Sequence, residues 1–155
     1  MAQKNFRKNL EELGLELPSV AAPVAAYVPA VRSGDHVYTS GQLPFVDGAL
    51  PVTGIVGADV TEEQAYAAAR TATLNAIAAI DDLVGLDNIE RIVKVNGFVA
   101  STAEFSGQPG VINGASELLG EIFGDAGVHA RAAVGVAALP LNAPVEVEII
   151  AQISA

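Results

Sequence analysis

The chain lacks two residue types, and each absence excludes some chemistry. It contains no cysteine, which excludes disulfides, thiol nucleophiles and zinc sites built on thiolates. It also contains no tryptophan, and aromatic residues make up only 5% of its 155 residues, so side chains that could stack on a sugar ring are scarce. A chain without cysteine suits a reducing compartment, and we expect the protein in the cytoplasm.

Positive charge is scarce as well. Eight Lys and Arg residues stand against 18 Asp and Glu, which gives a formal net charge of −10. A chain with this charge repels phosphate backbones and anionic membrane surfaces within a Debye length. We therefore expect neither nucleic acid nor a membrane among its partners.

Long hydrophobic runs and a secretory signal are also missing. The longest apolar stretch, residues 20–31, has about twelve residues and contains prolines, whereas a membrane-spanning helix needs about twenty. Residues 1–15 are charged and amphipathic and lack the apolar core of a secretory signal. The length predicts one domain over residues 1–155, with residues 1–23 forming a helix and an extended lead-in.

Hydrophobic patterns along the chain predict alternating strands and helices. They indicate a helix over 6–13, strands over 27–32 and 36–40, a loop over 51–60, a long helix over 61–85, a strand over 89–100, a helix over 111–123, and strands over 131–139 and 145–153. Thr61 and Gln64 have the spacing of a capping box at the start of the long helix. Its apolar stripe runs from Ala65 to Leu83 and is rich in alanine, which favours close approach to a sheet.

After the first helix the predicted order is ββαβαββ, an α+β domain whose helices cover one face of a sheet. The pattern offers no further long helix for the other face. Hydrophobic residues make up 51% of the chain and charged residues only 17%, below the roughly 25% of an ordinary soluble domain. We therefore expect a homo-oligomer in which the second face is covered by other copies of the chain.

Arg131 is the residue that says most about function. Between Asp125 and Glu146 it is the only charged side chain apart from the titratable His129, and it begins an apolar run that predicts a buried strand. A buried guanidinium needs a carboxylate partner. The sequence leaves two partners open: Glu146 or Glu148 in a structural ion pair, or the carboxylate of a substrate held by the guanidinium.

Glu146 and Glu148 form the second candidate feature. They are two residues apart on a predicted strand, so their side chains share one face about 7 Å apart. A solvated strand face gives this pattern, although Ile150 continues the same face and indicates partial cover. Glycoside hydrolysis by such a pair is disfavoured by the few aromatic residues. We predict no metal site, because His36 and His129 lack a ligand spacing.

Four segments follow one another in an order that is more specific than any one of them. They are Tyr38–Pro44 (YTSGQLP), Arg131–Val136 (RAAVGV), Leu139–Pro140 (LP) and Val145–Glu148 (VEVE). Together they resemble the Rid (YjgF) family of reactive-intermediate deaminases, over residues 24–153. The extended N-terminus and the region from residue 100 (ASTAEF) to Asn113 look like the longer bacterial branch of that family.

The resemblance implies a chorismate-mutase-like α+β fold and a homotrimer with clefts between adjacent subunits. It also implies hydrolysis of 2-imino acids or their enamines, such as 2-aminoacrylate, to 2-keto acids and ammonia, without a cofactor. In this family an arginine matching Arg131 holds the substrate carboxylate, and a glutamate matching Glu146 helps to position the water. The resemblance further implies a backbone contribution from Gly41 and a cleft lined by three more side chains, Tyr27, Ser40 and Asn113.

The residues are compatible with that chemistry, since an oriented water and a fixed cation are sufficient parts for attack on an iminium carbon. Two other functions remain open at this point. One is a binding module for small carboxylate metabolites that performs no reaction. The other is RNA cleavage or translation inhibition, which the net charge disfavours.

Overall fold

The computed structural model describes residues 4–20 and 25–154, so the last residues of the predicted lead-in, 21–23, lie outside the described residues. The elements are α1 (Phe6–Glu12), β1 (Ala30–Ser33), β2 (His36–Thr39), α2 (Glu62–Val84), β3 (Ile89–Ala100), α3 (Gln108–Phe123), β4 (Ala130–Val136) and β5 (Val145–Ile153), with short 3-10 turns at Leu86–Asn88, Gly124–Gly127 and Pro140–Asn142. The predicted order ββαβαββ after the first helix is confirmed.

The strands form one mixed sheet in the order β1-β2-β5-β3-β4. β3 and β4 run parallel, whereas the other neighbouring strands are antiparallel. The last strand in the sequence, β5, therefore lies in the middle of the sheet, and β4 lies at an edge. This placement brings the two segments that carry Arg131 and Glu146 to either side of β3.

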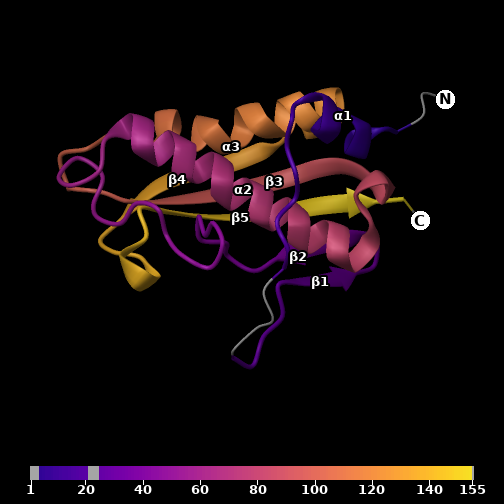
Figure 1. The fold of residues 1–155 in the computed structure, drawn as a ribbon, viewed down its shortest axis with the longest axis horizontal. Helices are drawn as coiled ribbons and strands as arrows, with labels where there is room; N and C mark the ends of the chain where they lie inside the picture. Colours follow the sequence, from indigo (N-terminus) through magenta and orange to yellow (C-terminus); the bar gives the residue numbers. More distant parts are fainter. Residues whose placement is uncertain (1–3, 21–24, 155) are drawn as a thin grey trace.

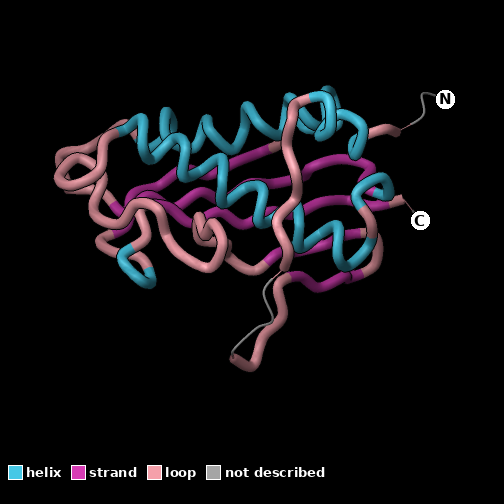
Figure 2. Tube along the Cα trace, viewed as in Figure 1, coloured by secondary structure: helices cyan, strands magenta, loops and turns pink. Residues whose placement is uncertain are grey.

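The helices lie together on one face of this sheet, with α2 and α3 side by side across it (Figures 1 and 2). The capping box at the start of α2 is confirmed: the Thr61 hydroxyl accepts from the Gln64 backbone N–H at 3.1 Å, and the Gln64 side chain accepts from the Thr61 N–H at 2.9 Å. Buried alanines let α2 approach its neighbours closely, among them Ala65, Ala72 and Ala76. The predicted stripe is wrong at one end, because Leu83 is 45% exposed.

The other sheet face carries the alternate residues of each strand. On β5, buried residues such as Val147 and Ile149 alternate with the half-buried Glu146, Glu148 and Ile150. No helix among residues 4–20 and 25–154 covers this second face (Figure 1). Several large apolar side chains on it are strongly exposed, namely Val31, Tyr38 and Val134.

Two predicted strands differ from the observed ones. The first begins at Ala30 and not at residue 27; Pro29, just before it, has no N–H to donate to a ladder. The strand predicted over 131–139 ends at Val136, and the chain then turns through Pro140. It is also not buried, because β4 is an edge strand that pairs only with β3.

The N-terminal helix is anchored to the far end of the helical layer. The ring of Phe6 packs edge-on against Phe123 with 4.7 Å between centroids, and the Asn9 side chain donates to the Ile122 carbonyl at 2.7 Å. After α1, residues 14–20 cross the outside of α2 (Figure 1). None of the described helices is long and apolar enough to cross a membrane.

Candidate functional site

Arg131 lies on the edge strand β4 and reaches toward α3. Its Nη1 donates to Asn113 Oδ1 at 2.9 Å and to Ser116 Oγ at 3.2 Å, and its Nη2 donates to the Pro109 carbonyl at 3.3 Å. A guanidinium has five N–H donors, so the Nε–H and one Nη2–H remain for a ligand. These two donors can meet the two oxygens of a carboxylate.

The register of the sheet decides which residues can meet Arg131. Val95 on β3 pairs with Arg131 on one side and with Ile149 on the other, so these three side chains share the helical face. Glu146 pairs with Phe98, three residues further along β3. Since side chains alternate along a strand, Glu146 projects from the opposite face to Arg131.

The predicted structural ion pair between Arg131 and Glu146 or Glu148 is therefore wrong within one chain. The ion pairs among the described residues join other partners, and Arg131 bonds only to neutral acceptors. Glu148 instead accepts from the Asn96 side chain at 3.0 Å. A half-buried guanidinium without a carboxylate is a group with unused capacity for an anionic ligand.

Glu146 borders a different cavity, of about 370 Å³. Tyr27 and Gly41 also border it, so three of the predicted site residues meet here. The segment that holds Gly41 is fixed to β5, because Gln42 and Val147 exchange backbone hydrogen bonds of 2.8 and 3.0 Å. The cavity thus lies where the chain leaves β2 and runs beside the start of β5.

Gly41 and Glu146 approach each other as closely as a glycine allows. A Cβ added at Gly41 would lie 2.5 Å from Glu146 Oε1 and 2.8 Å from its carboxyl carbon. The carboxylate therefore rests directly on the Gly41 backbone. Burial raises the pKa of the Glu146 carboxyl above its usual range, and repulsion from the Glu148 carboxylate raises it further.

Ser40 does not border this cavity. Its hydroxyl donates to the Val28 carbonyl at 2.6 Å, and its backbone N–H donates to the Pro29 carbonyl at 2.8 Å. Ser40 therefore fixes the segment that leads from Tyr27 into β1. The structure thus separates the six predicted residues into three groups: Tyr27, Gly41 and Glu146 at the cavity, Ser40 behind it, and Asn113 with Arg131 on the helical side.

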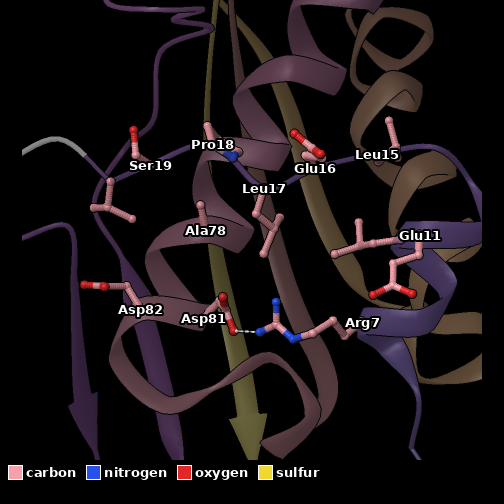
Figure 3. Close-up of a pocket in the computed structure, with 12 residues that line it drawn as sticks. Arg7, Glu11, Leu15, Glu16, Leu17, Pro18, Ser19, Ala78, Asp81 and Asp82 are labelled. Carbon is pink, nitrogen blue, oxygen red and sulfur yellow. Dashed lines mark hydrogen bonds and ion pairs between the residues drawn. The ribbon is translucent and has the colours of Figure 1, made fainter.

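Sequence reasoning missed the N-terminal segment as part of the cavity wall. Pro18, Ser19 and Val20 border the same cavity as Glu146. They form the end of the stretch that crosses α2. The helix before this stretch, α1, is tied to α2 by an ion pair of 2.5 Å between Arg7 and Asp81 (Figure 3). Only the fold brings this segment to the cavity, so no local pattern could have identified it.

Asn75 is a second residue that the sequence analysis missed. Its side chain donates to the carbonyls of Leu43 and Phe45 at 2.9 and 3.1 Å, which fixes the loop after Gly41 against α2. The sequence signal that could have identified Asn75 is its position as a polar residue within the alanine-rich helix.

His129 and Ser116 lie beside Arg131 and were also missed as part of its surroundings. His129 Nε2 is 2.9 Å from Ser116 Oγ, and its Nδ1 is 2.6 Å from the Gly127 carbonyl. Both border an open hollow of about 330 Å³ together with Asn113 and Arg131. Over residues 4–20 and 25–154, no group of three His, Asp or Glu side chains is placed to hold a metal ion.

The chain is an α+β domain with one open sheet face, and its Arg131 and Glu146 lie at separate hollows. Residues 7–153 match the family model described as "YjgF/chorismate_mutase-like, putative endoribonuclease". The chain belongs to this family, as its sequence motifs indicated.

Two relatives show the range of names within the family. Protein TCP17 of Trypanosoma cruzi is 44% identical over 156 residues, which cover 99% of this chain and 98% of the relative. The 2-iminobutanoate/2-iminopropanoate deaminase of Escherichia coli K12 is 34% identical over 130 residues, which cover 84% of this chain and 89% of that enzyme.

Solved structures agree with the fold. Atu1372 of Agrobacterium tumefaciens, a protein of unknown function, superimposes with a TM-score of 0.89 at 45% identity, over 97% of this chain and 92% of its own. E. coli TdcF, solved with bound serine, has a TM-score of 0.63 at 26% identity, over 87% of this chain and 94% of its own.

Proposed function

We infer that this protein hydrolyses small 2-imino acids to 2-keto acids and ammonia, at sites formed between adjacent copies of the chain in a homotrimer. The observation that carries the proposal is the separation of Arg131 from Glu146. One chain holds a cation with unused donors on the helical face of the sheet, whereas the Glu146 carboxylate projects from the opposite face and borders a separate cavity. A second copy is needed to bring the two groups to one substrate.

The exposed side chains of the sheet support assembly. Val31, Tyr38 and Val134 lie on the open face, and β4 presents an unpaired edge. Apolar surface of this kind is covered in a closed oligomer, and a heterologous interface that closes forms a ring. In such a ring the Arg131 of one subunit faces the Glu146 cavity of the next.

The reaction needs few groups. The Arg131 guanidinium binds the substrate carboxylate and directs C2 toward the water. The Glu146 carboxylate holds the water and takes one of its protons as the oxygen adds to C2 of the iminium form of the substrate, while the π electrons of the C=N bond move to nitrogen and give a neutral carbinolamine. Glu146 then returns this proton to the nitrogen. The C2–N bond breaks, its electron pair leaves with ammonia, and the carbinolamine hydroxyl gives its proton to the Glu146 carboxylate as the C2=O bond of the keto acid forms.

The surroundings of Glu146 and Arg131 suit their roles as base and as carboxylate-binding group. A carboxyl whose pKa is raised is a better base near neutral pH than an exposed one. One charge-assisted contact contributes about 1.5–3 kcal/mol, and millimolar affinity requires about 4.1 kcal/mol. A single arginine with a few supporting contacts therefore suits rapid turnover of a small molecule. A relative named as a 2-imino acid deaminase supports the same reaction.

The test combines two inactive variants. Arg131→Ala and Glu146→Gln are each expected to abolish release of ammonia and keto acid from freshly generated 2-aminoacrylate, measured above the uncatalysed rate. The two are then mixed in equal amounts, dissociated and reassembled. In random trimers about a quarter of the sites combine an intact Arg131 with an intact Glu146, so about a quarter of the wild-type activity returns.

Each other result has a defined meaning. If no activity returns although mass spectrometry shows mixed oligomers, Arg131 and Glu146 do not act together in a site formed by two subunits. If the wild-type trimer accelerates no imine, but binds pyruvate saturably, the protein is a carboxylate-binding module. A monomeric wild type would contradict the shared site from the start.

A further inference from the structure

A chain of hydrogen bonds connects Arg131 to the backbone of the turn after α3. The Arg131 Nη1 contacts Ser116 Oγ at 3.2 Å, Ser116 Oγ contacts His129 Nε2 at 2.9 Å, and His129 Nδ1 contacts the Gly127 carbonyl at 2.6 Å. None of these side chains except Arg131 belongs to the predicted site.

With a neutral His129 ring, the chemistry of the two ends gives a direction to every bond. The Gly127 carbonyl can only accept, so His129 carries its proton on Nδ1. In the neutral ring Nε2 is then an acceptor, and the Ser116 hydroxyl must donate to it. The lone pairs of Ser116 Oγ are consequently turned toward Arg131, whose guanidinium can only donate.

Arg131 gains a fixed direction from this arrangement. Its Nη1 is held by two acceptors, Ser116 Oγ and Asn113 Oδ1, and its Nη2 by the Pro109 carbonyl. A free arginine side chain carries about 2 kcal/mol of rotamer entropy, which a bound ligand would otherwise have to overcome. Because a small carboxylate makes few contacts, a guanidinium held in advance improves its binding.

We propose that Ser116 and His129 are positioning residues that hold the Arg131 guanidinium ready for the substrate carboxylate. The proposal rests on the function inferred above, because it concerns the same arginine. His129 accepts the Ser116 hydroxyl proton and so orients this hydroxyl. The lone pairs of Ser116 Oγ then accept from Arg131 and orient the guanidinium. Neither side chain needs to touch the reacting carbon.

Ser116 and His129 also have the spacing of a nucleophile and its base. The Ser116 oxygen, however, already accepts from the Arg131 N–H, which lowers its capacity to attack. A nucleophilic role predicts that Ser116→Ala loses kcat at unchanged KM. A positioning role predicts that Ser116→Ala raises KM and leaves kcat nearly unchanged. The two roles are therefore separable by kinetics.

The test uses four variants of the full chain. Ser116→Ala and His129→Phe break the chain of bonds, and we expect each to raise KM for 2-aminoacrylate and Kd for pyruvate about three- to tenfold, with kcat within about twofold of wild type. His129→Gln restores an acceptor for the Ser116 hydroxyl and should recover most of the affinity. Ser154→Ala, a serine whose hydroxyl bonds to Glu90, should change neither constant.

Further readouts separate this proposal from the proposed function and from misfolding. Nitrogen NMR of the His129 ring should show the proton on Nδ1, whether or not the protein is an enzyme, and a proton on Nε2 overturns the proposal. Unchanged Kd and KM in both Ser116→Ala and His129→Phe also overturn it. A wild type that binds pyruvate without deaminating imines overturns only the function. Thermal unfolding and oligomer size of each variant show whether it folds.

Discussion

Arg131 and Glu146 project from opposite faces of the same sheet, although only β3 separates their strands. The parallel pairing of β3 with β4 places Arg131 opposite Val95, and the antiparallel pairing of β3 with β5 places Glu146 opposite Phe98. The three-residue offset along β3 puts the cation among the helices and the carboxylate at the cavity beside Gly41. Within one chain the two charges therefore do not form an ion pair.

The contact between Gly41 and Glu146 gives the first prediction. A methyl group at Gly41 would meet the Glu146 carboxylate, with 2.5 Å to Oε1. The end of this flexible side chain can move, so Gly41→Ala should change the free energy of unfolding little. The displaced carboxylate should lower kcat/KM for imine hydrolysis about 10- to 100-fold.

Steady-state ammonia release and chemical denaturation measure the two effects separately. Gly34→Ala is the control for a methyl group added in open space, although its φ of +61° makes that variant slightly less stable. Full activity in Gly41→Ala would show that the position of Glu146 is unimportant for the reaction.

The raised pKa of Glu146 gives the second prediction. In the proposed reaction the carboxylate form of Glu146 is the active one, so activity should fall as the pH decreases through this pKa, at a pH above the usual glutamate range. Repulsion from Glu148 contributes to the shift, so Glu148→Gln should move the acidic limb of the kcat profile to lower pH. An unmoved limb would show that another group titrates in the reaction.

The same shift has a consequence for stability. Unfolded glutamate has a pKa of about 4.3, and in the folded chain the pKa of Glu146 is higher. Between these two values the folded state keeps a proton that the unfolded state has lost, so stability decreases as pH rises. Glu146→Gln removes this loss and should be more stable than wild type at pH 7. Denaturation curves at pH 7 and pH 4 should show the difference disappearing at the lower pH.

Local sequence patterns were sufficient for much of the fold. The capping box at Thr61 and the alternation along β5 each follow from neighbouring residues, and both occur as predicted. The edge position of β4 could not be predicted in this way, because its apolar residues have the pattern of a buried strand. Whether such a strand is central or at an edge depends on pairing with distant strands, which composition does not determine.

The candidate site was less accessible to such reasoning. The motifs identified Arg131 and Glu146, but their placement on opposite faces required the register of three strands. The direction of the Ser116 and His129 side chains required the turn after α3. Val20 reaches the cavity only because the N-terminal segment crosses α2, a tertiary arrangement with no local signal.

For two glycines on α3, we predict that alanine changes the free energy of unfolding in opposite directions. A Cβ at Gly120 would meet nothing within 4 Å, whereas a Cβ at Gly114 would collide with the Tyr66 carbonyl on α2. Alanine is a better helix former than glycine, so Gly120→Ala should stabilise the protein by about 0.5–1 kcal/mol. Gly114→Ala should force the helices apart and destabilise it by about 1–3 kcal/mol. Urea denaturation of both variants checks the pair, and equal effects would contradict the close approach of α2 and α3.

The N-terminal segment gives the last prediction, which concerns substrate size. Val20 borders the Glu146 cavity at the end of the segment that crosses α2, and the ion pair between Arg7 and Asp81 ties the preceding helix, α1, to α2. Removing two methyl groups there enlarges the cavity, and each methylene in a pocket alters selectivity by about 1–3 kcal/mol. Val20→Ala should therefore raise kcat/KM for the imino acid derived from leucine, relative to that for 2-aminoacrylate, by about tenfold. Val52→Ala, at a separate surface hollow, is the matched control and should leave the ratio unchanged. Competition between the two substrates, followed by keto-acid analysis, gives the ratio directly. If Val20→Ala keeps the wild-type ratio, the Val20 side chain does not limit the size of the substrate.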